Sequence, residues 1–107
     1  CSNVSEKSFL VSHGLPQGLT VEDLKASGAI GDVLGQFLDK DGNSVSQAID
    51  DRAIGMPLNK VLKVPEKILS AAGPHKVDII RAACRRGLVD TLVTDDVTAE
   101  LLLAKAP

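Results

Sequence analysis

The alternation of apolar and polar positions in the second half of the chain predicts a strand, a helix and a second strand. Residues 67–72 form a short apolar run that stops at Gly73, and residues 88–94 form another that follows Gly87. Between the two glycines, residues 74–86 repeat apolar side chains at helical spacing, with polar side chains over the rest of the surface. A compact unit of this kind predicts two parallel strands joined by a right-handed crossover. The apolar face predicted for the helix consists of Val77, Ile80, Ala83 and Cys84.

The glycine turn before this helix is a candidate anion site. The first N–H groups of a helix have no partner within the helix, and they attract negative charge. Lys76 lies in the first helical turn, where a cation is unfavourable for the helix itself. A phosphate held at Gly73 would make this lysine favourable, whereas a solvated lysine on the exposed helix face is the simpler alternative. The turn is not a Walker loop, because GPHK lacks the spacing and the hydroxyl of that motif.

The start of the chain has a weaker pattern. A short helical piece is predicted at residues 6–11. Thr20 and Asp23 then resemble a capping box that opens a helix over residues 21–27, and Gly28 is expected to end it.

The middle of the chain predicts extended segments. Residues 29–38 are predicted to form one strand, residues 39–43 a polar turn and residues 44–49 the partner strand. Residues 52–56 are predicted as a third extended piece, and a short helix is predicted at residues 57–63.

The end of the chain predicts a last helix over residues 96–105, capped by Asp95. Taken with the earlier segments, this order predicts an α/β fold with a mainly parallel sheet, helices on both faces and some antiparallel pairing. The apolar face predicted for the last helix consists of Val97, Leu101 and Ala104.

Composition narrows the function classes. The 107 residues, 44% of them hydrophobic, suffice for one small domain. The net charge of −2, the scattered Lys and Arg and only two aromatic residues argue against direct nucleic-acid binding. Cys1 and Cys84 make no disulfide framework, and a buried Cys84 would fit a reducing compartment. No apolar run long enough to span a membrane is present, and no cofactor or metal is expected.

Residues 39–50, DKDGNSVSQAID, imitate a calcium loop of the calmodulin type. Oxygen ligands stand at the first, third and fifth positions. The sixth position, normally glycine, is Ser44, and the twelfth, normally glutamate, is Asp50. A hairpin turn explains the same residues, so calcium binding is the weaker interpretation.

The Gly31–Asp32 pair lies inside an otherwise apolar segment, AIGDVLG. Asp32 is either a solvated residue at a strand edge or a group that accepts hydrogen bonds from sugar hydroxyls. In the second case Gly31 and Gly35 would let the backbone approach a ligand closely.

Two stretches, GAIGDVLGQFLDKDGNSV and the segment from DDRAIGMPL to LVTDDVTAELLL, strongly resemble the C-terminal part of SorC-type bacterial transcriptional regulators. The resemblance covers about residues 19–103. It implies an effector domain with the fold of phosphosugar isomerases and deaminases. It also implies that residues 1–107 are a C-terminal fragment of that domain, without the helix-turn-helix DNA-binding domain.

The same resemblance assigns ligand-binding roles. It implies that Asp32 faces the sugar hydroxyls and that Val33 and Leu34 line the pocket beside it. Gly73 and Lys76 are implied to contact the effector phosphate. The chain departs from the family in having Ala72 where a second glycine is frequent in the turn.

We therefore expect an effector-binding module rather than an enzyme. Its implied partners are a phosphorylated sugar, operator DNA through the absent domain, and further copies of itself as a dimer or tetramer. A cytoplasmic protein without membrane contact is expected. A phosphosugar isomerase or deaminase on the same fold is the alternative, although no His or Glu partner for Asp32 is evident nearby in sequence.

Overall fold

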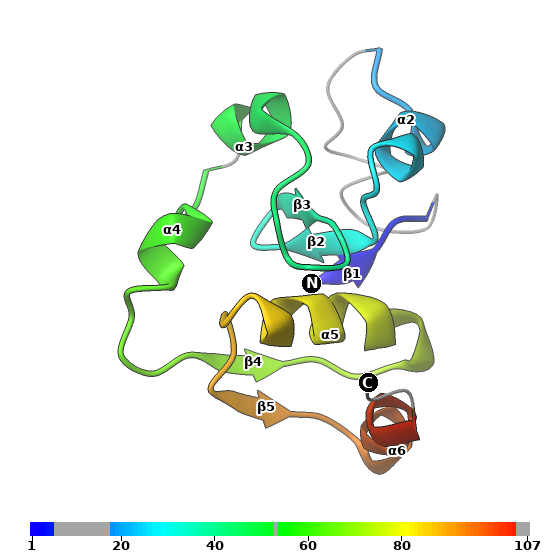
Figure 1. The fold of residues 1–107 in the computed structure, drawn as a ribbon, viewed down its shortest axis with the longest axis vertical. Helices are drawn as coiled ribbons and strands as arrows, with labels where there is room; N and C mark the ends of the chain where they lie inside the picture. Colours follow the sequence, from blue (N-terminus) through cyan, green and yellow to red (C-terminus); the bar gives the residue numbers. More distant parts are fainter. Residues whose placement is uncertain (6–17, 53, 105–107) are drawn as a thin grey trace.

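The computed structural model describes residues 1–5, 18–52 and 54–104 and confirms the α/β class (Figure 1). The helix predicted at residues 6–11 lies outside the described residues. In chain order the elements are β1 (Ser2–Asn3), α2 (Val21–Ala26), β2 (Gly31–Val33), β3 (Gln36–Leu38), α3 (Gln47–Arg52), α4 (Leu58–Val61), β4 (Ile68–Ser70), the 3₁₀ helix η1 (Pro74–Lys76), α5 (Val77–Arg85), β5 (Thr91–Val93) and α6 (Asp96–Ala104).

The strand–helix–strand unit is confirmed. β4 and β5 pair in parallel, with Ile68 opposite Thr91 and Ser70 opposite Val93, and α5 connects them through Gly87 at φ 80°. Among the described strands, parallel pairing is confined to this pair, so the expectation of a mainly parallel sheet does not describe them.

The other sheet is antiparallel, in the order β1–β2–β3. The prediction of one strand over residues 29–38 is wrong, because a tight turn at Leu34 and Gly35 folds β3 back on β2. Both turn residues have positive φ angles, 53° and 81°. Such two-residue hairpins usually contain Asn-Gly or Asp-Gly, so Leu-Gly gave no turn signal.

α5 lies between the two sheets (Figure 1). On one side it packs against residues of β2 and β3, Val33 and Leu38, and on the other Leu69 of β4 adjoins the same core. The helix therefore buries more of its surface than one amphipathic face. Cys84 was predicted to be buried but is exposed. The buried residues of α5 are Val77, Ile79, Ile80, Ala82 and Ala83.

A second core fills the opposite side of the antiparallel sheet. Phe37 of β3 packs there with Leu24 of α2 and Ile49 of α3. The prediction of a strand over residues 44–49 is therefore wrong. Only a single β-bridge joins Ser44 to Leu38 in this segment, and the residues from Gln47 onward are helical.

The remaining predictions are partly confirmed. The capping box of α2 and the short helix α4 are present, whereas the described part of residues 52–56 contains no strand. The side chain of Asp95 accepts a hydrogen bond from the Thr98 N–H and so caps α6. The face of α6 differs from its prediction, since Thr98 is fully buried while Val97 and Ala104 are exposed.

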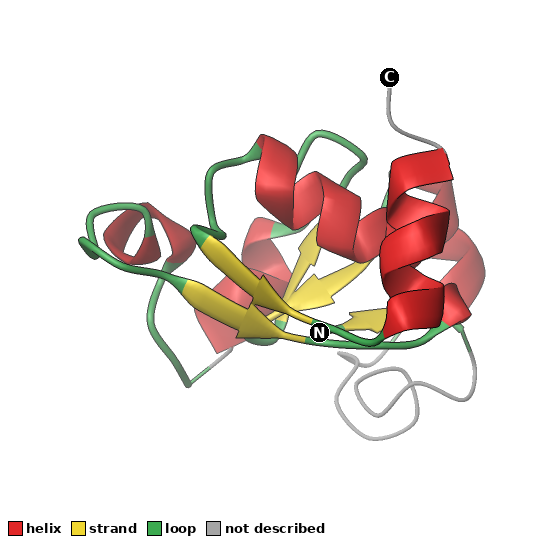
Figure 2. Cartoon of the chain, turned by 90° about the horizontal axis from the view of Figure 1, so that it is seen from below, coloured by secondary structure: helices red, strands yellow, loops and turns green. Residues whose placement is uncertain are grey.

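The outer face of the parallel pair is uncovered by any described helix (Figure 2). Ile68 and Val93 point to this face and are 64% and 54% exposed. Within the described ranges no helix has the length and apolarity that a membrane crossing requires.

Candidate functional site

Asp32 is a buried carboxylate in the middle of β2, with 7% of its surface exposed. Ser2 stands directly opposite it on β1, and the Ser2 hydroxyl donates a hydrogen bond to Asp32 Oδ1. Within the described part of the chain Asp32 Oδ2 has no hydrogen-bond partner, so this oxygen is available to an external donor. Of the two interpretations of Asp32, the solvated strand-edge aspartate is wrong, because this residue is buried on the central strand of a three-stranded sheet.

The side chains of Val33 and Leu34 lie in different environments from that of Asp32. Successive strand residues point to opposite faces, and Val33 packs into the core against α5. Leu34 lies at the hairpin tip, where 54% of its surface is exposed. The structure therefore does not bring these two side chains together, and the expectation that both line a pocket beside Asp32 stays a prediction.

Gly31 permits a close approach of neighbouring elements, whereas the predicted close approach was that of a ligand. A Cβ atom at this position would lie 2.3 Å from the Ser2 carbonyl oxygen and 2.8 Å from Ile79 Cβ. The missing side chain lets β1 and α5 meet β2, and this packing places Ser2 against Asp32.

The glycine turn before α5 is held by α6. Gly73 has φ 125°, and its N–H donates to Thr98 Oγ1 at 2.8 Å. The Lys76 N–H donates to the Gly73 carbonyl oxygen at 3.0 Å. Two N–H groups that were expected to face an anion are therefore engaged within the protein. The N–H of His75 takes part in none of these bonds.

Lys76 ends η1 and precedes the first residue of α5, with its side chain partly buried. β1 packs against η1 and also pairs with β2. The strand that carries Ser2 therefore adjoins both the element with Lys76 and the strand with Asp32. These two predicted residues flank β1, whereas Val33 and Leu34 lie elsewhere.

Thr98 is the residue that the sequence did not reveal. It lies 25 positions after Gly73, on a helix whose buried side was predicted differently. Its position beside the turn follows from the packing of α6 against η1 and α5. A threonine in the first turn of a helix gives no signal of its own, because it is common near helix starts.

The calcium-loop interpretation finds no support in the geometry. Asp39 Oδ1 accepts hydrogen bonds from the N–H groups of Asp41 and Asn43, at 2.9 and 3.0 Å, which closes a turn as expected for a hairpin. Within the described ranges, no three His, Cys, Asp or Glu residues are placed to hold a metal ion.

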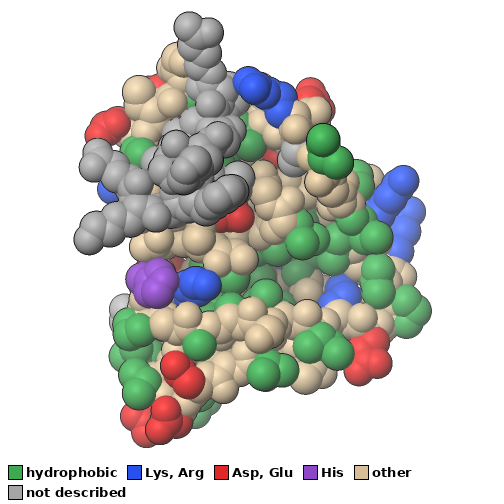
Figure 3. Space-filling view, turned by 180° about the vertical axis from the view of Figure 1, so that it is seen from behind, with side chains coloured by type: hydrophobic (Ala, Val, Ile, Leu, Met, Phe, Trp, Pro, Cys, Tyr) green, Lys and Arg blue, Asp and Glu red, His purple; other side chains and the backbone are tan. Residues whose placement is uncertain are grey.

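The side of the molecule opposite to Figure 1 is shown in Figure 3. Hydrophobic side chains gather towards the middle of this face, and Lys and Arg side chains lie singly or in small groups around them. On the described part of this face, the basic side chains form no continuous surface of the kind that fits nucleic acid.

Comparisons with known proteins agree with this architecture. Residues 3–104 match the family described as "Putative sugar-binding domain". The transcriptional regulator LsrR of Escherichia coli is 39% identical over 77 residues, which cover 71% of this chain and 24% of that regulator. The chain thus spans about a quarter of the length of this relative.

Solved structures give the same result. The full-length sorbitol operon regulator SorC from Klebsiella pneumoniae has a TM-score of 0.79 at 26% identity, covering 95% of this chain and 32% of that chain. A DeoR family transcriptional regulator from Listeria monocytogenes has a TM-score of 0.83 at 27% identity, over 94% and 41%. These relatives are transcriptional regulators and not isomerases or deaminases. The chain therefore belongs to the family of sugar-binding domains found in SorC-type transcriptional regulators.

Proposed function

We propose that this chain binds a phosphorylated sugar as the effector of a bacterial transcriptional regulator. The main supporting observation is the buried Asp32 carboxylate, which accepts a hydrogen bond from the Ser2 hydroxyl. Ser2 belongs to β1, and β1 also packs against η1, the 3₁₀ helix that ends at Lys76. In a sugar-binding domain, Asp32 would supply an acceptor for the sugar hydroxyl groups and Lys76 a cation for the phosphate.

Asp32 acts in the proposal as the sugar-recognising group. A carboxylate that is already ordered by one internal hydrogen bond loses little further freedom when a ligand hydroxyl donates to its second oxygen. A buried carboxylate also discriminates strongly against ligands that lack the donor, because it is then left unpaired.

Lys76 acts as the phosphate-binding group. The Gly73 N–H donates to Thr98, so the turn itself contributes less to anion binding than its sequence suggested. The proposal therefore gives the larger share of phosphate attraction to the Lys76 ammonium, with Gly73 keeping the turn in its positive-φ shape. Ala72 stands where a second glycine is frequent, and its side chain limits how closely a phosphate approaches this side of the turn.

The chain is further proposed to be the C-terminal part of a larger effector domain. The uncovered face of β4 and β5 supports this, because parallel strands are normally covered on both faces. In that larger domain the pair would belong to a mainly parallel sheet of the phosphosugar isomerase type. The chain covers only 32–41% of the two regulator structures compared above, which leaves room for that addition.

In the intact regulator, effector binding would shift the protein between operator-bound and released states. The coupling would pass through subunit contacts in a dimer or tetramer to a separate DNA-binding domain. A regulator that binds bacterial operator DNA would act in the cytoplasm.

The test is isothermal titration calorimetry of the intact protein with a panel of sugar phosphates. Lys76→Ala should raise the dissociation constant of the best ligand at least tenfold, since a charged hydrogen bond contributes roughly 1.5–3 kcal/mol. Lys63→Ala, which alters an exposed lysine near α4, is the matched control and should leave affinity unchanged. Equal affinity in wild type and Lys76→Ala would remove the phosphate role. Asp32→Ala should in addition reduce discrimination among the sugars.

A further inference from the structure

A cavity of about 390 Å³ lies at the opposite end of α5 from the Lys76 turn. Its walls come from β3, the turn after β3, α3 and the start of α4, and Arg86, the C-cap residue of α5, lines it as well. This volume falls within the range of small-molecule sites in proteins.

The lining of this cavity is rich in side chains that both donate and accept hydrogen bonds. Ser44 adds a hydroxyl group, and Leu58 and Pro57 supply a small apolar area. No aromatic side chain lines the cavity among the described residues. The amide side chains of the lining are those of Gln36, Asn43, Gln47 and Asn59.

One carboxylate oxygen of Asp50 has no hydrogen-bond donor among the described residues of the lining. The Ser44 hydroxyl donates to Asp50 Oδ2. Asp50 Oδ1 is buried and has no hydrogen-bond partner in the described part of the chain. A buried carboxylate oxygen without a partner is costly, so a rotation of the Asp50 carboxylate that brought this oxygen to a hydroxyl donor in the cavity would be favourable.

The walls are held in place by contacts that do not use the cavity. The Gln36 side-chain amide donates to the Met56 carbonyl oxygen at 3.2 Å and joins β3 to the segment before α4. Gly42 lies so close to α5 that a Cβ atom would be 2.4 Å from Arg86 Cβ. Arg85 Nη1 donates to the Lys40 carbonyl oxygen at 3.3 Å, which fixes the same turn.

Charge narrows the class of ligand. Asp50 and Asp51 disfavour a small anion, and Arg86 disfavours a small cation. The scarcity of apolar lining disfavours a flat hydrophobic molecule. We propose that this cavity binds an uncharged, polyhydroxylated small molecule, a free monosaccharide or sugar alcohol, whose hydroxyl groups donate to Asp50 and exchange hydrogen bonds with the amides.

This cavity is separate from the effector site proposed above and does not depend on it. In the antiparallel register Gln36 stands opposite Val33, whereas Asp32 stands opposite Phe37. Gln36 and Asp32 therefore point to opposite faces of the sheet. Lys76 lies at the other end of α5 from Arg86.

Calorimetric titration of the intact protein with neutral monosaccharides and sugar alcohols tests the proposal. Saturable binding of at least one of them is expected, and Asp50→Ala should weaken it at least tenfold. Asp41→Ala is the matched control, since Asp41 is exposed on the same turn and does not line the cavity. If Asp50→Ala does not fold, Asn59→Ala replaces it as the test variant and should weaken binding of the neutral ligand. Lys60→Ala, which alters an exposed neighbour outside the lining, is then the control.

Three outcomes would overturn the proposal. The first is that no neutral sugar or sugar alcohol binds. The second is that calcium chloride or ammonium chloride alone produces the Asp50-dependent signal. The third is binding that survives Asn59→Ala and is lost in Lys76→Ala, which would place the neutral ligand in the effector site. Binding that is unchanged in Lys76→Ala supports the second site whether or not sugar phosphates bind.

Discussion

Thr98 Oγ1 accepts a hydrogen bond from the Gly73 N–H at 2.8 Å and so ties the last helix to the turn that precedes α5. The Thr98 side chain is fully buried, and its own N–H donates to Asp95 at 2.7 Å. One residue thus connects the cap of α6 with the proposed phosphate turn, and this connection can be tested by substitution.

Thr98→Val should lower the free energy of unfolding by about 1–3 kcal/mol, because the Gly73 N–H then loses its acceptor. Urea denaturation followed by circular dichroism measures this change. Thr94→Val is the matched control. Thr94 Oγ1 is buried and unpartnered among the described residues, so removing it should be neutral or stabilising. Equal losses in the two variants would mean that the hydrogen bond contributes nothing specific.

Gly31→Ala should destabilise the protein by roughly 1–3 kcal/mol, because the added Cβ would overlap the Ser2 carbonyl and Ile79. Gly55→Ala is the control, since the nearest atom to its added Cβ is the Leu34 carbonyl oxygen at 3.8 Å. Thermal unfolding of both variants gives the comparison. A Gly31→Ala protein that melts with the wild type would show that β1 shifts freely away from β2.

Leu34→Asn should raise the free energy of unfolding by about 1 kcal/mol, because leucine is strained at a φ of 53° and asparagine tolerates this region. Little packing is lost, since the Leu34 side chain is largely exposed. Leu34→Ala removes the same side chain without relieving the backbone and should not be stabilising. If the alanine and asparagine variants are equally stable, backbone strain is not the cause.

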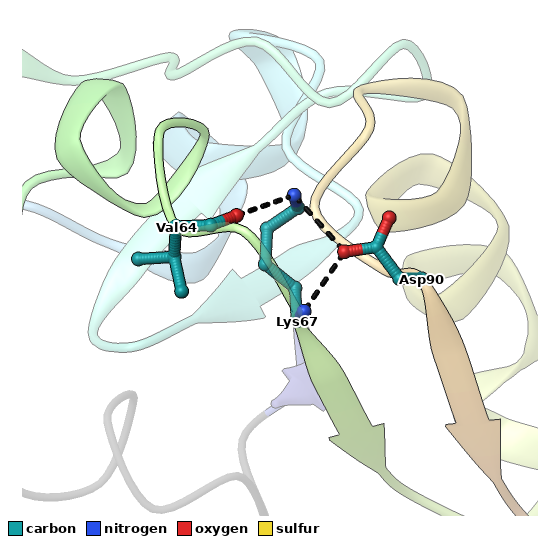
Figure 4. A network of polar contacts seen from close by, with 3 residues as sticks. All are labelled: Val64, Lys67 and Asp90. Carbon is teal, nitrogen blue, oxygen red and sulfur yellow. Dashed lines mark hydrogen bonds and ion pairs between the residues drawn. The ribbon is translucent and has the colours of Figure 1, made fainter.

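The stability of the β4–β5 pair should depend on acid through Asp90 (Figure 4). The Lys67 ammonium lies 3.1 Å from Asp90 Oδ2, and the Lys67 N–H donates to the same oxygen at 2.8 Å. Hydrogen bonds from the Lys67 side chain and then its backbone lower the pKa of Asp90. A pKa that is lowered by folding contributes stability above the ordinary value of about 4, and that stability is lost as the pH falls through the folded value.

Asp90→Asn should therefore flatten the fall in stability between pH 5 and pH 2, roughly the interval over which aspartate titrates. Urea denaturation at several pH values measures this slope. Lys67→Met should flatten it only in part, because the Lys67 N–H remains. A slope for Asp90→Asn that equals the wild-type slope would contradict the assignment.

Local signals in the sequence were sufficient for several elements. The capping box of α2, the glycine after α5 and the Asp95 cap of α6 each depend on hydrogen bonds or φ angles within a few residues. The strand–helix–strand unit has a strong period and was found for that reason.

The failures concern features that tertiary packing decides. A hairpin that turns on Leu34 has no turn residue at its first position, and the strain is accepted because β2 and β3 both bury their side chains. Cys84 is exposed although it was predicted to be buried, and Thr98 is buried although it was not part of the face predicted for α6. Both differences arise because the buried faces of α5 and α6 depend on which elements surround them. Of the candidate site, Asp32 and Lys76 lie on elements that both adjoin β1, whereas Val33 packs in the core and Leu34 is exposed at the hairpin tip.

α5 has nine residues, so at 1.5 Å per residue it is about 14 Å long, with the Lys76 turn at one end and the Arg86 cavity at the other. α5 thus joins the two ends through a single rigid element. If binding at one end shifts this helix, the affinities at the two ends change by the same factor in either direction. The affinity of the regulator for one carbohydrate would then depend on the concentration of the other.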